Sequence, residues 1–482
     1  MQQLAARVVL TFESERNVPF AFWIGDRVWL NHIESHRMIQ VHPNLQSVEQ
    51  ASALQRRLYR TIRETMRAMA GRISGVASWE AKKLLARHIW LDAEHAEALR
   101  QRVLELRFPR VDVDVAVDKA LLAVLAKLPA TCSDSEFLAG VYRVIKPAVL
   151  AAVQRYLQQS DPLADSPSHR AMAAIVRELA EELQEFESVW ATLPAAEREA
   201  ASAWADWLRS ALAEAGEIFG QDTGTALRVR AGFSDRPPYR ISLMPQRDAR
   251  WLPAVTQVPP RPPRSPQEQQ IWVAIDHVNE LWACELSAAL IWEHEQLPWE
   301  IYRDTARWAY DEMRHAMMGE RRLQAYGFAV GVDVPMVPDH WMGVASRGGL
   351  EAMLFVVHGL EQAGPKWKQQ LKAELWAMGD PYSSQDCDYD WADEAGHIRY
   401  GQDWIKALFP QMSKEEIIAR TQREVESWKE WIAEKHRTGK HGYEVFLPRL
   451  EAKCALMPDL ACPEFFQPLG SSAATVSYER KD

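Results

Sequence analysis

Two short segments in the C-terminal half repeat one arrangement of side chains that can bind metal. The segments DEMRH at 311–315 and DEAGH at 393–397 each contain a Glu followed three residues later by a His. Of the fourteen His in the chain, only His315 and His397 have a Glu at that position. Since residues three apart lie on one face of an α-helix, each segment can offer a carboxylate and an imidazole to one metal ion. Two such helices, each joined by a Glu from a neighbouring helix, form the ligand set of a dinuclear carboxylate site in a four-helix bundle.

The Glu on the helix before Glu312 is sought by its distance from the intervening turn. Antiparallel helices joined by a short turn place residues equidistant from that turn at the same height. Glu285 lies 13 residues before Pro298, a proline suited to the first turn of a helix, and Glu312 lies 14 after it. Glu285 is therefore favoured. Glu280 is the competitor, but the midpoint between Glu280 and Glu312, where the turn would then be centred, falls at Gln296. The helix face of Glu280 is also rotated by about 140° from that of Glu285.

The corresponding Glu of the third helix is predicted to be Glu361. It lies 33 residues before Glu394, and Gly379-Asp380-Pro381 supplies the break between the two helices. Glu351 is a weaker candidate, since 43 residues would require two very long helices. The six predicted metal ligands are Glu285, Glu312, His315, Glu361, Glu394 and His397. Four carboxylates and two imidazoles nearly neutralise two divalent ions and leave coordination positions open for water, oxygen or substrate.

These residues resemble the ferritin-like di-iron carboxylate proteins. DEMRHA at 311–316 is similar to the second-helix motif of bacterioferritin, DEAGHI at 393–398 is similar to its fourth-helix motif, and the 33-residue spacing is also similar. The 27-residue spacing from Glu285 to Glu312 departs from bacterioferritin. The resemblance covers about residues 270–410 and implies a fold and a metal site more firmly than a reaction. It implies two iron ions, although manganese or a mixed pair suits the same ligands. It also implies that Asp311 and Asp393 orient the ligating imidazoles across the bundle.

Three further residues are expected near the same cavity, because residues three or four positions from a ligand share its helix face. Asp390 lies one turn before Glu394, where some N-oxygenating relatives have an additional His, and is expected beside the ligands rather than among them. His358 and Tyr400 are the candidate catalytic residues. His358 is also a candidate seventh ligand, although a core or hydrogen-bonding His is favoured. For Tyr400, a hydrogen-bonding Tyr is favoured over a redox-active phenol.

The N-terminal half carries a weaker version of the same pattern, which predicts an internal duplication. Asp92 and His95 are three residues apart, and Glu64 precedes Asp92 by 28 residues with a break near Ser78. The expected third helix, residues 137–159, has no carboxylate. The ligand set is therefore incomplete in this half.

The expected third helix has positively charged side chains at the positions where a metal ligand is expected. Lys146 and Arg143 would repel a divalent ion, while Lys146 would form a buried ionic cluster with Glu64, Asp92 and Glu178. We interpret this half as a ferritin-like bundle that has lost its metals. The alternative is an ordinary helical bundle over residues 50–190 with a coincidental Asp-x-x-His.

The predicted fold is all-α, with two ferritin-like four-helix bundles in tandem. The helical periodicity and the Pro/Arg-rich runs divide the chain into five parts. These are an N-terminal cap with short extended segments (1–48), a degenerate bundle (50–219), an irregular linker or arm (220–266), a metal-binding bundle (267–440) and an irregular tail (441–482).

Composition agrees with a soluble, enzyme-sized protein. A length of 482 residues predicts two or three domains, and 47% hydrophobic residues is ample for large cores. No uncharged apolar run approaches the roughly 18 residues of a membrane span, and the first residues lack the apolar core of a signal peptide, so a cytoplasmic location is expected. Five widely spaced Cys fit reduced thiols, and the net charge of -10 argues against a nucleic-acid-binding surface.

The expected function is that of an O2-dependent di-iron oxidoreductase of the oxygenase or hydroxylase type. Its expected partners are a small organic substrate, O2 and an electron donor, without nucleic acid or membrane, and a homodimer is compatible with the sequence. One alternative is iron handling or peroxide detoxification, although two bundles with long arms fit poorly into a storage cage. The other alternative is a metal-free helical scaffold in which the paired Glu and His form buried polar networks.

Overall fold

The computed structural model describes residues 10–12, 20–22, 46–106, 113–114, 118–220, 233, 235–242, 244–253, 261–328, 333–337, 342–438 and 443–458. Within these residues the secondary structure is helical apart from two pairs of very short strands, which confirms the predicted all-α fold. β1 (Leu10–Phe12) pairs antiparallel with β2 (Phe20–Phe22), and β3 (Leu252–Pro253) pairs parallel with β4 (Pro335–Met336). The rest of the predicted cap over residues 1–45 lies outside the described residues.

The first half is built on four long helical segments with shorter helices around them. Its helices are α1 (Val48–Arg72), α2 (Trp79–Glu105), α3 (Lys119–Leu125), α4 (Asp134–Ala139), α5 (Lys146–Gln159), α6 (Ser166–Thr192) and α7 (Ala195–Glu214). α1 packs on α2 and α5, α6 packs on α2 and α5, and α7 covers α4. A capping box between Ser47 and Gln50 satisfies backbone N–H groups at the start of α1.

The second half is also built on long helices that pack in pairs. Its helices are α8 (Pro266–Asn279), α9 (Leu281–Glu293), α10 (Trp299–Ala325), α11 (Met342–Ala377), α12 (Pro381–Leu408), α13 (Lys414–Thr438) and α14 (Tyr443–Cys454). α8 and α9 both pack on α10, α10 packs on α12, α11 packs on α12, and α13 covers α11. Glu280 stands at the break between α8 and α9. α11 is kinked at Gly349, where φ is 74°, so the long stretch after the kink faces α12.

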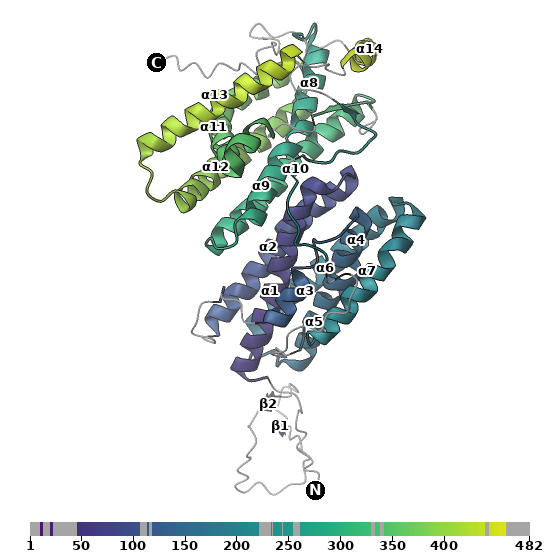
Figure 1. The fold of residues 1–482 in the computed structure, drawn as a ribbon, viewed down its shortest axis with the longest axis vertical. Helices are drawn as coiled ribbons and strands as arrows, with labels where there is room; N and C mark the ends of the chain where they lie inside the picture. Colours follow the sequence, from purple (N-terminus) through teal and green to yellow (C-terminus); the bar gives the residue numbers. More distant parts are fainter. Residues whose placement is uncertain are drawn as a thin grey trace, which may run out of the picture.

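The two halves pack against each other through one of the hydrophobic clusters. In Figure 1 the purple-to-blue helices of the first half lie directly against the teal and green helices of the second. α2 packs on α10 and α1 packs on α9. Trp90 stacks on Tyr310 with ring centres 5.0 Å apart, and Tyr59 meets Trp299 edge-on at 5.6 Å. Large aromatic rings therefore join the halves, and a continuous cluster of buried apolar side chains runs through both.

The described part of the predicted arm is non-helical and lies over the junction of the two halves. The Tyr239 hydroxyl donates a hydrogen bond to the Gly71 carbonyl at 3.0 Å, and the Gln246 backbone N–H donates to the Ser74 carbonyl at 2.8 Å. Arg247 reaches Glu285 on α9. The arm thus connects the end of α1 to the second half.

The prediction of an irregular tail from residue 441 is wrong for its first part, because α14 is a helix. Tyr443, Phe446 and Leu450 lie at the i, i+3 and i+7 positions and are all buried. Phe446 meets Trp272 of α8 edge-on at 5.5 Å. This packing stabilises a short helix despite Pro448 within it. Residues 459–482 lie outside the described residues.

Candidate metal centre

The two Asp-Glu-x-x-His segments face each other across the second half. α10 carries Glu312 and His315, α12 carries Glu394 and His397, and the two helices pack together. All four side chains are buried, and the imidazole ring centres are 5.9 Å apart. The repeated sequence pattern is therefore also a spatial pair.

Three overlapping groups of potential metal ligands lie between these helices and their neighbours. Within each group, one ligand atom from every residue lies within 4.8 Å of the others. The groups are Glu280–Glu312–His315, Glu312–Glu361–His397 and His315–Asp390–Glu394, and a fourth, His277–Glu280–Asp390, adjoins them. Because the groups share residues, they form one connected cluster of carboxylates and imidazoles.

Glu280 is the residue that joins this cluster from the first helix, so the assignment of Glu285 is corrected. The connection between the end of α9 and the start of α10 is centred on Gln296, which is also midway between Glu280 and Glu312. The prediction placed the centre at Pro298, which is the N-cap of α10 and belongs to one side of the turn. A shift of two residues in the turn centre was enough to select the wrong Glu.

Glu285 instead forms a buried ion-pair network away from the cluster. Its carboxylate lies 2.6 Å from Lys82 Nζ of α2 and 2.7 Å from a guanidinium nitrogen of Arg247. Lys82 also donates to the Ile73 carbonyl at 2.6 Å. This residue therefore joins the first half, the arm and α9.

His315 is held with one ring nitrogen toward the cluster and the other toward a carboxylate outside it. Its Nδ1 atom lies 3.1 Å from Glu280 Oε2 and 3.3 Å from Asp390 Oδ1. Its Nε2 atom is hydrogen-bonded to Asp393 Oδ2 at 3.2 Å. An Nε2–H that donates to Asp393 leaves the Nδ1 lone pair free to bind a metal.

His397 is arranged in the reciprocal way from the opposite helix. Its Nδ1 atom lies 3.2 Å from Glu312 Oε1 and 3.6 Å from Glu361 Oε1, while Nε2 lies 3.6 Å from Asp311 Oδ2. Each Asp of the repeated segments therefore lies next to the imidazole of the other segment. This is the arrangement in which a carboxylate orients a ligating His.

Two arginines balance the charges of these outer carboxylates. Arg307 Nε lies 2.7 Å from Asp311, and Arg314 lies 2.5 Å from Asp311 and 3.0 Å from Asp393. The charge of the central cluster is therefore carried by Glu280, Glu312, Glu361, Asp390 and Glu394.

Several polar atoms of the cluster are buried without a hydrogen-bond partner. They are His315 Nδ1, His397 Nδ1 and Nε2, Glu280 Oε2, Asp390 Oδ2 and Glu394 Oε2. Buried polar atoms in native proteins are nearly always hydrogen-bonded, so this set of buried nitrogen and oxygen atoms without partners requires an explanation. The residues fit a bound metal ion, since carboxylate and imidazole atoms are its ordinary ligands.

The cluster is also short of positive charge. Burial alone would lower the pKa of His315 and His397, but the carboxylates facing them raise both well above the usual range of histidine. Burial raises the pKa of Glu361, and its neighbour His397 offsets this only in part. Without metal, the negative charge of the carboxylates therefore favours protonation of these side chains. Divalent cations would balance the same negative charge.

Lys368, which the sequence interpretation missed, lies inside the cluster. Its ammonium group pairs with Asp390 and with Glu394, and lies 3.7 Å from Glu280 Oε1. Lys368 is seven residues after Glu361 on α11, so it lies two turns along the same helix face. That spacing is the signal that could have found it.

The two candidate catalytic residues take different positions. His358 packs under Gly401, where an added Cβ would lie 2.9 Å from its Nδ1, and its Nε2 is hydrogen-bonded to Gln362 at 2.5 Å. It belongs to none of the metal-binding groups of the described residues, and burial lowers its pKa to about 4. The ring centre of Tyr400 lies 6.3 Å from that of His397, and its side chain lines a pocket on the other side.

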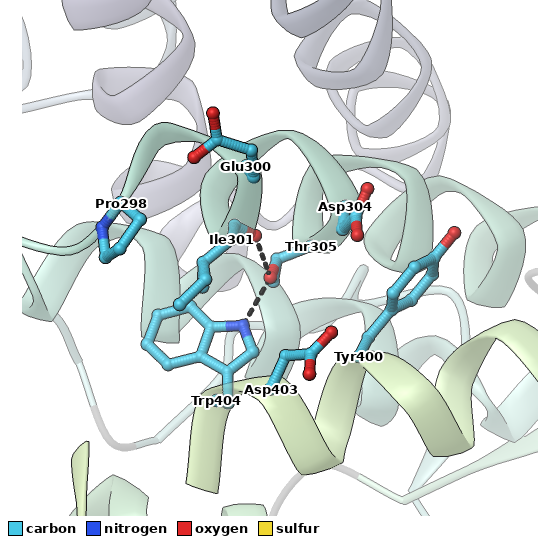
Figure 2. Close-up of a pocket in the computed structure, with 8 residues that line it drawn as sticks. All are labelled: Pro298, Glu300, Ile301, Asp304, Thr305, Tyr400, Asp403 and Trp404. Atoms are coloured by element: carbon cyan, nitrogen blue, oxygen red, sulfur yellow. Dashed lines mark hydrogen bonds between the residues drawn. The ribbon is translucent and has the colours of Figure 1, made fainter. Parts of the chain in front are cut away.

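This pocket of about 190 Å³ lies between α10 and α12 (Figure 2). Its floor is held by the Trp404 indole, which donates to the Thr305 hydroxyl, and Thr305 in turn donates to the Ile301 carbonyl at 2.6 Å. The lining residues are Pro298, Glu300, Ile301, Asp304, Thr305, Tyr400, Asp403 and Trp404. Trp308 and Tyr400 form an aromatic layer beside His397, with ring centres 5.5 Å and 6.3 Å from it. Because Tyr400 also lines the pocket, the pocket adjoins the cluster.

The corresponding region of the first half contains an internal cation. Lys146 Nζ lies 2.6 Å from Asp92 and 2.5 Å from Glu182, and His95 is hydrogen-bonded to Glu178 at 2.8 Å. The predicted ionic cluster therefore forms only in part. Lys146 pairs with Asp92 as predicted, but its second partner is Glu182, and Glu178 pairs with His95 instead. Asp92, His95 and Glu182 are close enough to hold a metal, but the ammonium of Lys146 already pairs with both carboxylates.

Glu64 does not belong to that cluster, which corrects the prediction. It lies among arginines of its own helix, 3.2 Å from Arg63 and 3.1 Å from Arg67. The Arg67 guanidinium also donates to the Trp292 carbonyl at 3.1 Å, so this face of α1 is turned toward the second half. The packing of α1 on α9 has taken the residue away from the interior of its own half.

We expect purified protein to hold about two metal ions per chain, all in the second half. Replacing His95 by alanine should leave the metal content unchanged, because Lys146 satisfies the carboxylates beside it. Metal analysis of wild type and the His95→Ala variant measures this. Four ions per chain, or loss of metal in the variant, would contradict it.

The described residues thus define an all-helical protein with a buried carboxylate–imidazole cluster. The chain belongs to the family whose description is "Protein of unknown function (DUF455)", and the family model matches residues 196–445. That range contains every residue of the cluster and leaves α1 to α6 outside. Comparison with curated proteins and with solved structures gave no match. Among the described residues, no helix is both long and apolar enough to cross a membrane.

Proposed function

We propose that the second half binds two metal ions, iron or manganese, and uses them to oxidise a small organic substrate with O2. The observation that supports this most directly is the pair of buried Nδ1 atoms, one from His315 and one from His397, that face carboxylates without hydrogen bonds. One ion would lie at the His315 position, formed by Glu280, His315, Asp390 and Glu394. The other would lie at the His397 position, formed by Glu361 and His397, with Glu312 shared between the two.

We also infer that this half is a ferritin-like bundle and that the first half is a degenerate copy of it. The proposed metal ligands follow the order Glu, Glu-x-x-His, Glu, Glu-x-x-His along α8–α9, α10, α11 and α12. With Glu280 as the first donor, its spacing to Glu312 is 32 residues, close to the 33 between Glu361 and Glu394. The correction of Glu285 therefore strengthens the resemblance to the ferritin-like di-iron proteins.

Two bound iron ions supply the redox chemistry that activates O2 at such a centre. Net hydroxylation of a C–H bond places one oxygen atom in the product and the other in water. This balance requires two electrons and two protons, so an electron donor is part of the proposal.

The chain itself supplies orientation and a place for the substrate. Asp393 is hydrogen-bonded to the His315 imidazole, Asp311 lies 3.6 Å from that of His397, and the Trp308 indole donates a hydrogen bond to Glu312 at 2.9 Å. The pocket beside Tyr400 is the substrate site of the proposal, because one layer of aromatic side chains separates it from His397.

The test is O2 consumption by protein loaded anaerobically with Fe(II). We expect uptake to stop after about one turnover in the absence of substrate, and to resume only with electrons and an organic substrate. His397→Ala should abolish this uptake, while the matched change His95→Ala in the first half should not. Continued uptake with added Fe(II), with many ferric ions accumulating per chain, would instead show iron handling.

A further inference from the structure

Lys368 makes the two sides of the cluster chemically unequal. Its side chain is 8% exposed, and its ammonium group is paired with Asp390 and Glu394 and lies 3.7 Å from Glu280. All three of these carboxylates belong to the His315 position. Among the described residues, the ion pairs of Glu312 and Glu361 are formed with imidazoles alone.

An ammonium group among these carboxylates competes with a metal ion for the same oxygen atoms. Like charges a few ångströms apart in a protein interior repel strongly, so a divalent ion binds there only when the ammonium group moves away. Lys has a flexible four-carbon stem that allows such a movement. The His397 position requires no displacement of this kind.

The charge of the cluster is nevertheless sufficient for two ions. Five carboxylates, from Glu280, Glu312, Glu361, Asp390 and Glu394, carry five negative charges. Two divalent ions and one ammonium group carry five positive charges, provided that both imidazoles are neutral. The lysine therefore lowers the affinity for the second metal ion because its ammonium group occupies the same place. The total charge of the cluster does not exclude that ion.

We propose that Lys368 sets the order of metal binding, so that the His397 position is filled first and the His315 position is filled second and more weakly. This inference rests on the proposed metal centre and adds a regulated, stepwise loading to it. In the empty His315 position an internal cation offsets part of the negative charge, and the second metal ion must displace it.

Titration of the metal-free full-length chain with Mn²⁺ tests the order, with calorimetry and the electron paramagnetic resonance of free Mn²⁺ as readouts. We expect two steps, with the second at least roughly tenfold weaker than the first. His397→Ala should remove the strong step, and His315→Ala should remove only the weak one. These two variants test the order without any change at Lys368.

Lys368→Met removes the charge and keeps most of the side-chain volume. We expect it to strengthen the second step by roughly tenfold or more, because nothing has to be displaced. Without metal it should have a lower thermal midpoint than wild type, since Asp390 and Glu394 lose their cation, and Mn²⁺ should raise that midpoint more than in wild type. Lys372→Met is the matched control, because Lys372 lies one turn further along α11, is partly exposed and pairs with Asp388 at 2.6 Å.

Two equal steps in wild type, or an unchanged second step in Lys368→Met, would overturn the inference and leave the metal centre in place. Loss of the strong step in His315→Ala would overturn it as well. The absence of Mn²⁺ binding in wild type and in every variant would instead overturn the proposed function itself.

Discussion

Replacing Glu280 by alanine is expected to remove much of the bound metal, and replacing Glu285 by alanine is expected to destabilise the protein instead. Glu280 lies 3.1 Å from His315 Nδ1 and contributes a carboxylate to the cluster. Loss of a ligand should weaken metal binding at the His315 position by roughly 100-fold or more. Metal analysis and urea unfolding of the two variants measure the two effects side by side.

The Glu285→Ala effect follows from the burial of its partners. Lys82 and Glu285 are almost completely buried, and Arg247 is 9% exposed. Removing the carboxylate leaves two buried cations without it, which costs about 3 to 5 kcal/mol when a buried pair is broken from one side. The metal content should stay at the wild-type level. Metal loss in Glu285→Ala at full stability, with metal retained in Glu280→Ala, would return the ligand assignment to Glu285.

Replacing Glu361 by alanine should lower metal content and O2 reactivity much more than folding stability. Glu361 contributes the third-helix carboxylate of the His397 position, 3.6 Å from His397 Nδ1. Its removal takes away a ligand while the apolar side chains around it on α11 stay in place. We expect the strong metal-binding step to weaken by roughly 100-fold or more. Mn²⁺ titration and Fe(II)-dependent O2 uptake measure both losses.

Glu351→Ala is the matched control on the same helix. Glu351 lies near the start of α11, 3.8 Å from His294 and outside the metal-binding groups of the described residues. Its replacement should change neither metal content nor O2 uptake. Equal effects of the two variants would indicate that α11 contributes only packing.

The sequence by itself determined the features that depend on local spacing. The repeated Glu-x-x-His places a carboxylate and an imidazole on one helix face whatever the rest of the fold does. A different argument, the 33-residue spacing to Glu394 across a single helix break, selected Glu361. The helical periodicity also predicted an all-α chain, which the structure confirms.

The tertiary structure decided which other side chains join these residues. Glu280 replaced Glu285 because the break between α8 and α9 and the centre of the next turn are set by packing against α10 and α1. Glu64 left its expected cluster because α1 packs on α9 of the other half. Each of these outcomes depends on contacts between segments far apart in the chain.

The position of Lys368 at the centre of the site could not be predicted from the sequence either. Its distance from Glu361 along the helix was readable, but a lysine on a helix usually extends its charge into water. Only the arrangement of α8–α9, α11 and α12 places Asp390, Glu394 and Glu280 around that ammonium group. Local spacing fixes the helix face on which a residue lies. The packing of the helices decides whether that face meets water, an apolar core or opposite charge, because burial and charge pairing depend on atoms from other segments.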